Sequence, residues 1–217
     1  MEECALIKDF KYKDFLLALL DGNRKQSFQI VEHYLERGIT VKELYEEYIK
    51  KTLYRVGELW EHNKISVASE HLATAITESI LNSLFEKIVS EKRVGKSAIV
   101  ACVENEYHQV GIKMIADVFE MNGWDTHFLG ANVPVDELVA FAKAKDASIF
   151  ALSLSIYFHL PVLEKMLEKI TEAFPETSVI VGGQAFRHGG LEVVQKYPTV
   201  KYFKNLEDTE SFIKKIS

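Results

Sequence analysis

The sequence predicts two domains: a four-helix bundle in residues 1–92, then an α/β domain with a parallel, doubly wound, five-stranded sheet in residues 93–217. Three observations lead to this prediction. Up to about residue 91 the apolar residues recur at helical spacing. After the polar, glycine-containing stretch SEKRVGK, short apolar runs alternate with amphipathic segments. With 217 residues, 47% of them apolar, the chain is long enough to bury two cores.

The first domain is expected to contain four helices, at residues 11–20, 25–37, 41–62 and 66–90. The breaks between them fall at DGN, RGIT and HNKIS. Thr40 and Ser66 are predicted N-caps, because their side-chain oxygens can accept hydrogen bonds from the first amides of a helix. Glu43, three residues after Thr40, completes a capping box. The short connections predict an antiparallel bundle.

The second domain is expected to contain five strands, with the sequences SAIVACV, DTHFLG, SIFALSLS, SVIVGG and VKYFKN. Helices are expected at residues 110–122, 135–145, 160–173, 191–196 and 208–215. Strands joined by helical crossovers form a parallel sheet covered on both faces, here of the Rossmann-like (flavodoxin-like) type. In such a sheet ligands bind at the carboxyl ends of the strands.

Composition excludes several classes of protein. The net charge of −6 argues against a protein that grips nucleic acid, because such domains carry a basic stripe. Cys4 and Cys102 lie far apart, so no disulfide framework or zinc site is expected. The sequence has no export signal and no run of about 18 apolar residues. We therefore expect a soluble cytoplasmic protein with no membrane contact and no direct binding to nucleic acid.

A histidine follows the first predicted strand, in the stretch ENEYHQVG. A lone loop histidine is more often solvated than functional, but His108 has Glu106 two residues before it. A metal-ligating imidazole usually donates its other N–H to an outer-shell acceptor, and the carboxylate of Glu106 can serve. Gly111 opens the following helix, where the missing side chain lets a large ligand approach. The stretch therefore predicts a metal-bearing cofactor held by His108.

Two further features fall on the same edge of the sheet. Ser153 and Ser155 stand at the end of the third strand, and Gly182 and Gly183, followed by Gln184, stand after the fourth. Each feature alone is most often an ordinary turn or helix cap. Paired glycines indicate a close backbone approach or an unusual φ. Together with His108, these residues predict one ligand site.

These residues resemble the fingerprint of the cobalamin-binding domains, which is Asp-x-His-x-x-Gly, then Ser-x-Leu, then Gly-Gly. The match covers the whole second domain. The resemblance implies that His108 is the lower axial ligand of cobalt and displaces the dimethylbenzimidazole base of the cofactor, so that cobalamin is bound base-off. The nucleotide tail would then lie in a slot past Gly111, Ser153, Gly182 and Gly183. This chain departs from the fingerprint in having Glu106 for aspartate and Ser155 for leucine.

The helical domain contains a second cluster, in ELWEHNKISVASEHLATA. Alone, Trp60 suggests a core residue, and Glu70 with His71 suggests ordinary first-turn residues, since a carboxylate gains from the helix dipole. The order Trp, nine residues, Glu-His resembles the light-sensing branch of cobalamin proteins, the CarH-type photoreceptors. The resemblance implies that the bundle caps the upper face of adenosylcobalamin. Trp60 would shield the cobalt–carbon bond, Glu70 would hydrogen-bond the nucleoside, and His71 would support the same pocket.

Two differences from those photoreceptors shape the prediction. The repressors begin with a DNA-binding helix-turn-helix module, whereas this chain starts with the bundle, so we expect no repressor activity from it alone. Some members also carry a histidine directly after the tryptophan, where this chain has Glu61. His62 is one residue further on, and a helical step of about 100° turns it away, so a bis-histidine photoproduct is not expected.

We therefore predict a cobalamin-binding sensor rather than an enzyme, which responds to light or cofactor state through a homo-oligomer interface or a separate regulatory protein. The alternative is a corrinoid methyl carrier of a methyltransferase system, binding methylcobalamin. Such carriers usually have Asp-x-His-Asp-x-Gly-Lys, whereas Gln109 and Ile112 occupy the fourth and seventh places here. A protein-interaction module that has lost the cofactor is a third reading. A mutase is disfavoured, because no substrate barrel accompanies the domain.

Overall fold

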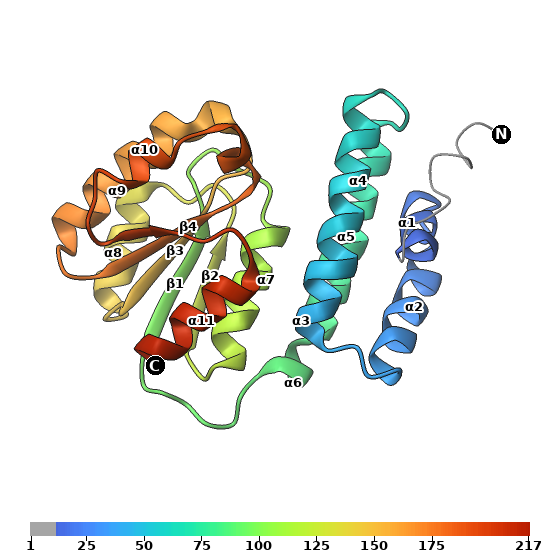
Figure 1. The fold of residues 1–217 in the computed structure, drawn as a ribbon, viewed down its shortest axis with the longest axis horizontal. Coiled ribbons are helices and arrows are strands. Elements are labelled where there is room, and N and C mark those ends of the chain that lie inside the picture. Colours follow the sequence, from blue (N-terminus) through green and yellow to red (C-terminus); the bar gives the residue numbers. More distant parts are fainter. Residues whose placement is uncertain (1–11) are drawn as a thin grey trace. The chain divides into compact units, whose positions relative to one another are not determined.

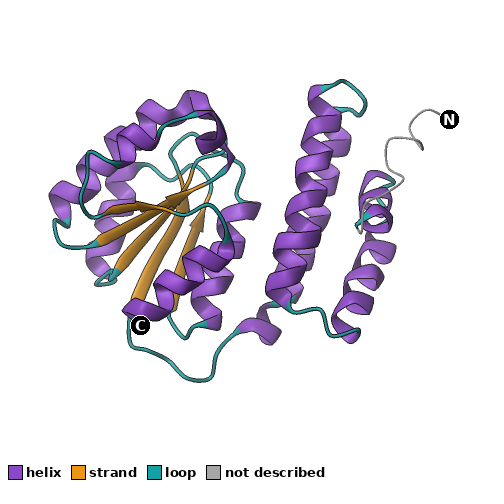
Figure 2. Ribbon diagram, viewed as in Figure 1, coloured by secondary structure: helices purple, strands orange, loops and turns teal. Residues whose placement is uncertain are grey.

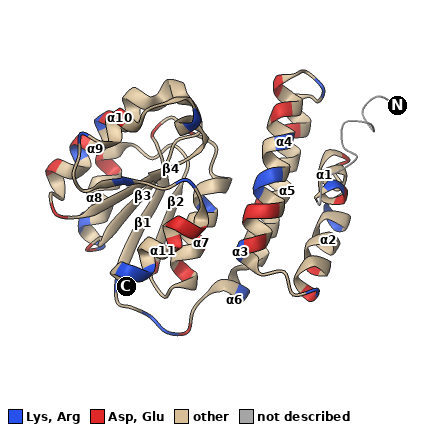
Figure 3. Cartoon of the chain, viewed as in Figure 1, with Lys and Arg blue, Asp and Glu red and all other residues tan. Residues whose placement is uncertain are grey.

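The computed structural model of the chain describes residues 12–217 (Figures 1 and 2). These residues divide into two compact units, the first ending at Lys87 and the second spanning Ile88–Ser217. Cys4 lies outside the described residues. Figure 3 shows basic and acidic residues interspersed along the helices of both units.

The first unit is helical, as predicted. Its helices are α1 (Lys13–Leu20), α2 (Arg24–Glu36), α3 (Val41–Glu43), the π-helix η1 (Leu44–Ile49), α4 (Lys50–Glu61), α5 (Val67–Ser83) and α6 (Phe85–Ile88), the last of which ends at the first residue of the second unit. The oxygen of Thr40 accepts from the amide of Glu43 at 3.2 Å, and that of Ser66 accepts from the amide of Ser69 at 3.1 Å. Both predicted N-caps are therefore present.

The third predicted helix contains a π-helical turn that the sequence pattern did not indicate. Helix α3, η1 and α4 follow one another without a break from Val41 to Glu61. A π-helix bonds residue i to i+5 and so accommodates one extra residue per turn. Leu44, Tyr45, Tyr48 and Ile49 are all buried in it. The wider turn thus adjusts the apolar face of this helix before α4 continues it.

The second unit is a five-stranded parallel sheet with helical crossovers. Its elements are β1 (Ser97–Cys102), α7 (Val110–Met121), β2 (Asp125–Gly130), α8 (Val135–Ala144), β3 (Ile149–Ser153), η2 (Tyr157–His159), α9 (Leu160–Ala173), β4 (Ser178–Gly182), η3 (Gln184–His188), α10 (Leu191–Val194), β5 (Val200–Tyr202) and α11 (Leu206–Ile216). The strand order is β2-β1-β3-β4-β5. This is the flavodoxin-like order, and the predicted fold class is confirmed.

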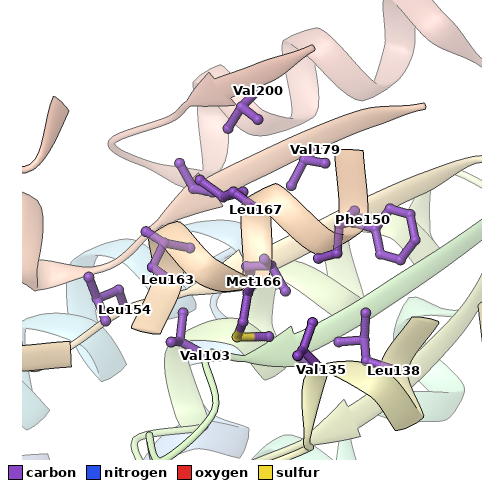
Figure 4. Close-up of a cluster of buried hydrophobic side chains, with 14 of the residues drawn as sticks. Val103, Val135, Leu138, Phe150, Leu154, Leu163, Met166, Leu167, Val179 and Val200 are labelled. Atoms are coloured by element: carbon purple, nitrogen blue, oxygen red, sulfur yellow. The ribbon is translucent and has the colours of Figure 1, made fainter. Parts of the chain in front are cut away.

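The core lies between the sheet and its helices. Strand residues alternate between the two faces, because successive side chains point to opposite sides. Ile99 of β1 and Phe150 of β3 belong to one buried cluster with Leu138 of α8 and Leu163 and Leu167 of α9, part of which Figure 4 shows. Helices α7 and α11 lie on the other face (Figure 1). Burial on both faces explains why the strands are almost continuously apolar.

The polar stretch near the start of the second unit is fastened to the rest of that unit. The amide of Val94 donates to the carbonyl of Gly123 at 2.9 Å. The guanidinium of Arg93 donates to Glu120 Oε2 at 2.8 Å and lies 3.3 Å from Asp125 Oδ1. A Cβ on Gly123, whose φ is +79°, would collide with the Lys92 carbonyl. The turn between α7 and β2 is therefore shaped to hold this segment closely.

The described residues were also searched for a membrane-spanning helix and for a reactive cysteine. Within residues 12–217, no helix combines the length and the apolar character needed to cross a membrane. Cys102, at the end of β1, is buried. Burial and the nearby charge of Glu106 raise the pKa of its thiol to about 12. This cysteine is therefore unreactive near neutral pH.

Candidate functional site

The site is organised around Glu106, in the loop after β1. Its side chain is fully buried, and both carboxylate oxygens accept hydrogen bonds. Oε1 accepts from the amides of Tyr107 at 3.0 Å and His108 at 3.3 Å, and from Nδ1 of the His108 ring. Oε2 accepts from the amides of Ser155 at 3.0 Å and Ile156 at 2.8 Å. A buried, ionised carboxylate is stable only when its oxygens accept hydrogen bonds, as both oxygens of Glu106 do.

The surroundings of Glu106 fix its charge. Burial raises the pKa of its carboxyl, but the hydrogen bonds from His108, Ile156 and Ser155 and the charge of the imidazole outweigh burial and lower it to about 2. Glu106 is therefore an anion at neutral pH and can only accept hydrogen bonds. Nδ1 of His108 must then be the donor, and in the neutral imidazole the lone pair lies on Nε2. The His108 side chain is 53% exposed.

This arrangement is what metal coordination by histidine requires. A ligating imidazole needs a fixed tautomer, a fixed ring orientation and an accessible nitrogen, and a carboxylate behind it supplies the first two. The substitution of glutamate for aspartate does not break the pair. The longer side chain of Glu106 reaches the imidazole with one oxygen and the loop after β3 with the other. Two loops of the carboxyl edge are thus joined through one carboxylate.

The glycines of the fingerprint differ in what surrounds them. A Cβ on Gly111, in the first turn of α7, would meet nothing within 4 Å, so the space beside it is open. Gly183 has φ +113°, and a Cβ there would collide with the carbonyl of Leu154. A Cβ on Gly182 would lie 3.1 Å from the Phe203 carbonyl. Gly183 is therefore required by the protein's own backbone, whereas Gly111 leaves room for a ligand.

The remaining predicted residues of the edge lie close by. Ser153 is the last residue of β3, is almost fully buried, and pairs in parallel register with Gly182 of β4. Ser155 is not part of the strand, which ends two residues earlier than the apolar run suggested, because its amide turns toward Glu106. Gln184 is exposed at the start of η3. The carboxyl ends of β1, β3 and β4 thus bring these residues to one edge.

Sequence reasoning missed two parts of this edge. Nδ1 of His159 is buried without a hydrogen-bond partner and lies 3.8 Å from Glu106 Oε2. Asn132, in the loop after β2, accepts from the amide of Asn105 at 3.0 Å and donates to the Tyr107 hydroxyl at 3.1 Å. Both asparagines have positive φ. Asparagine is enriched in that conformation. The two asparagines themselves were therefore the only signal in the sequence for the contacts among Asn105, Asn132 and Tyr107.

The predicted residues of the helical unit lie beside one turn. Trp60 is in the last turn of α4 and is 45% exposed, so it is not a core residue of this unit. Near the start of α5, Nδ1 of His71 lies 2.5 Å from Glu70 Oε2. Glu70 also accepts from the Thr74 hydroxyl at 2.9 Å. His62 directly follows α4, with its Nδ1 2.7 Å from the Glu58 carbonyl oxygen. The unit therefore presents a tryptophan and an ordered Glu-His pair at its surface.

The parallel α/β fold and the histidine at the carboxyl edge of its sheet define a class of protein. It is the class of cofactor-binding α/β proteins in which an oriented histidine stands at the carboxyl ends of parallel strands. Comparison with known families identifies the particular one. Family models described as a B12 binding domain match residues 96–209 and residues 12–84. The chain therefore belongs to the B12-binding domain family, as the fingerprint predicted, and is a cobalamin-binding protein.

Relatives of two kinds are similar to this chain. The HTH-type transcriptional repressor CarH of Myxococcus xanthus is 28% identical over 165 residues, which cover 76% of this chain and 54% of the repressor. Trimethylamine corrinoid protein 1 of Methanosarcina acetivorans is 24% identical over 173 residues, which cover 76% of this chain and 79% of that protein. This chain thus spans about half the length of CarH. Neither name is that of a catalyst.

A solved structure has the same fold. The monomethylamine corrinoid protein of Methanosarcina barkeri superposes with a TM-score of 0.80 at 14% identity, over 94% of this chain and 96% of that one. At this identity the likeness concerns the fold alone. Two features of the site fit cobalamin. His108 is half-exposed and is oriented by a buried anion, and the space beside Gly111 is open.

Proposed function

We propose that the chain binds cobalamin base-off, with Nε2 of His108 as the lower ligand of cobalt. The observation that carries this proposal is the pairing of His108 with Glu106, a buried carboxylate whose pKa is held at about 2. The anion keeps the proton on Nδ1, so in the neutral imidazole the lone pair lies on Nε2, where a metal can bind it. We further propose that the nucleotide tail lies past Gly111, Ser153 and the Gly182–Gly183 pair.

The lining of the proposed slot follows from the same edge. Ser155 follows β3 and Gln184 follows β4 at this edge. Ser155 has a short polar side chain, and its amide is already used by Glu106, so only its hydroxyl can contact the cofactor. Gln184 offers an amide group that can donate to and accept from the polar groups of the tail. These two residues would orient the cofactor, whereas His108 would hold the metal.

We propose that the bound form is adenosylcobalamin, and that Trp60, Glu70 and His71 contact its upper ligand. The support is that Trp60 is exposed, since a large aromatic side chain held at the surface is available to cover a ligand. Glu70 offers carboxylate oxygens to the hydroxyls of a nucleoside, and its contacts with His71 and Thr74 fix its orientation. CarH, which is 28% identical to this chain over 165 residues, is the relative that this proposal follows.

Adenosylcobalamin supplies, when bound, a cobalt–carbon bond that light can break. The protein's part is to hold the cofactor and to change an interface when the upper ligand changes, which requires two arrangements whose balance the cofactor shifts. We propose that the chain is such a sensor, and that a second copy of itself or a separate regulatory protein reads the change. Because the chain spans only part of CarH, DNA binding is not proposed for it.

Spectra and size before and after illumination test this function. The protein is loaded with adenosylcobalamin in the dark, its absorbance and sedimentation are recorded, and both are recorded again after green light. The sensor reading predicts a changed spectrum together with a changed size or partner affinity. His108→Ala should lose the cofactor, whereas His33→Ala, an exposed histidine of α2, should behave as wild type. An unchanged spectrum on illumination would exclude light sensing.

A methyl carrier for a methyltransferase is the second candidate. It is favoured by the trimethylamine corrinoid relative, which matches most of both chains. Gln109 and Ile112, at positions where such carriers usually have Asp and Lys, argue against it. Binding constants for methylcobalamin and adenosylcobalamin, measured in the dark, separate the two. Strong preference for methylcobalamin would support a methyl carrier and would contradict the proposed sensor.

A further inference from the structure

The loop after β1, which carries Glu106 and His108, is bound to the loop after β2 by Asn132. Oδ1 of Asn132 accepts a hydrogen bond from the amide of Asn105 at 3.0 Å, and Nδ2 donates to the Tyr107 hydroxyl at 3.1 Å. The amide of Asn132 donates to the carbonyl of Glu106, also at 3.1 Å. One residue therefore binds each of the three residues that precede His108.

Positive φ angles bring these two loops together. The angle is +54° at Asn132 and +69° at Asn105. A residue other than glycine in this conformation raises the free energy of the backbone, and the conformation is kept where surrounding contacts fix it. Asparagine tolerates it because the short polar side chain can bind nearby backbone groups, as the side chain of Asn132 does. The contacts of Asn132 and its backbone conformation thus support one another.

Contacts on both sides of His108 continue this attachment to the loop after β2. Gly130 has φ +74°, and a Cβ there would lie 2.7 Å from Oε1 of Gln109, so the side chain of Gln109 lies over the end of β2. Oε2 of Glu104 accepts from the amide of Val135 at 3.2 Å. Val135 is the first residue of α8 and lies in the buried core (Figure 4). The segment that carries His108 is therefore tied to a fixed part of the domain.

We propose that Asn132 is a positioning residue for His108, which acts through the backbone of the loop and not by contact with cobalt. This inference rests on the proposed coordination of cobalt by His108. Glu106 sets how the imidazole ring is turned, whereas Asn132 sets where the backbone that carries the ring lies. A metal ligand has to be held within about 0.5 Å of its bonding position. Without the Asn132 side chain, water or the cofactor's own base would compete better for the metal.

The variant Asn132→Gly isolates the contribution of the side chain. Glycine adopts positive φ readily and keeps the amide that donates to the Glu106 carbonyl. Only the contacts with Asn105 and Tyr107 are removed. Asn132→Asp keeps both, because a carboxylate accepts from the Asn105 amide and from the Tyr107 hydroxyl. The matched control is Asp146→Gly, which changes another exposed residue of positive φ, +50°, in the turn before β3.

Hydrogen exchange of the cofactor-free protein, followed by NMR, tests the contact itself. The amide of Asn105 should exchange about fivefold faster in Asn132→Gly than in wild type, because its acceptor is removed. The amide of Ile99 in β1 should exchange at the wild-type rate, which shows that the fold is intact. An unchanged rate for Asn105 overturns the proposal.

Binding of hydroxocobalamin, and electron paramagnetic resonance of the complex reduced to Co(II), test the consequence. The dissociation constant should rise about fivefold in Asn132→Gly, because binding must then order a loop that two hydrogen bonds of low-end strength order in wild type. When the histidines carry nitrogen-15, part of the Asn132→Gly signal should lack the doublet splitting that His108 gives. Asn132→Asp and Asp146→Gly should match wild type in both measurements.

Three outcomes in the loaded protein overturn the proposal. An unchanged dissociation constant in Asn132→Gly would show that the loop needs no such support. A weaker complex that keeps the full splitting from His108 would mean that Asn132 contacts the cofactor instead. Equal losses in Asn132→Asp and Asn132→Gly would show that the two hydrogen bonds do not position the loop. Absence of the splitting from His108 in wild type would refute the proposed function itself.

Discussion

The carboxylate of Glu106 accepts a hydrogen bond from the backbone N–H of Ile156 at 2.8 Å, fifty residues further along the chain. Because the same carboxylate also holds the His108 ring, the loop after β1 and the loop after β3 share one buried charge. The stability of the second unit and the orientation of its candidate metal ligand therefore depend on the ionisation of one side chain.

The first prediction concerns acid. The pKa of Glu106 is lowered from 4.5 to about 2 in the folded protein, so its ionisation stabilises the fold above the unfolded pKa and that contribution is lost as the pH falls through 4 toward 2. The full effect is about 3 kcal/mol in the free energy of unfolding. Denaturant unfolding of the cofactor-free protein at a series of pH values measures it. Glu106→Gln should flatten this part of the curve.

The control for this measurement is Glu168→Gln on α9, since Glu168 is exposed. That variant should keep the wild-type dependence on pH. A Glu106→Gln protein that still loses stability between pH 4 and 2 as wild type does would contradict the assignment of this charge.

The second prediction contrasts two glycines. Gly183→Ala should destabilise the cofactor-free protein by about 3 kcal/mol, because the residue has positive φ and a Cβ would collide with the Leu154 carbonyl. Gly111→Ala should leave stability unchanged or raise it by up to about 1 kcal/mol, since the space is open and alanine favours a helix. Cobalamin affinity should nevertheless fall in Gly111→Ala. Equal free energies of unfolding for the two variants would contradict the difference predicted between Gly183 and Gly111.

The third prediction concerns the segment before β1. Lys92 and Arg93 are trypsin sites, and the contacts of Arg93 with Glu120 and of Val94 with Gly123 should make cleavage there slow. Glu120→Ala removes the main partner of Arg93 and should speed cleavage several-fold, whereas Glu91→Ala, within the segment itself, should not. Peptide mapping after limited proteolysis identifies the bonds cut. Wild-type cleavage rates in Glu120→Ala would show that the segment is held by other contacts.

The fourth prediction concerns Trp60. Because this side chain is 45% exposed, Trp60→Ala should change the free energy of unfolding by less than about 1 kcal/mol. Cobalamin should still bind, but the preference for adenosylcobalamin over hydroxocobalamin should weaken. Competition binding in the dark measures the preference. Equal loss of affinity for every corrinoid would count against a contact between Trp60 and the upper ligand.

The order of the elements could be read from the sequence, because local periodicity sets it. Helical spacing marked the first unit, apolar runs marked five strands, and Thr40 and Ser66 marked two helix starts. The π-helical turn at Leu44–Ile49 could not be read in this way. Its signature is one additional residue in a helical pattern, which a 3.6-residue period tolerates.

The site could be predicted in part, for a related reason. Glu106 and His108 are neighbours in the chain, so their pairing was visible as a motif. The amides of Ser155 and Ile156 that complete the carboxylate's surroundings are distant in sequence, and the fold alone brings them there. Gly183 was predicted to mark a close approach or an unusual φ, and it has both, but the neighbour it accommodates is the backbone at Leu154.

The central claim is that a nitrogen of His108 coordinates cobalt, and electron paramagnetic resonance of the protein loaded with cobalamin and reduced to the Co(II) form tests it most directly. The nitrogen below the metal splits the signal into triplets when it is nitrogen-14 and into doublets when it is nitrogen-15. In protein whose histidines carry nitrogen-15, bound to unlabelled cobalamin, the account predicts doublets. Triplets that persist would mean that the benzimidazole base of the cofactor still holds the cobalt, and would contradict the account.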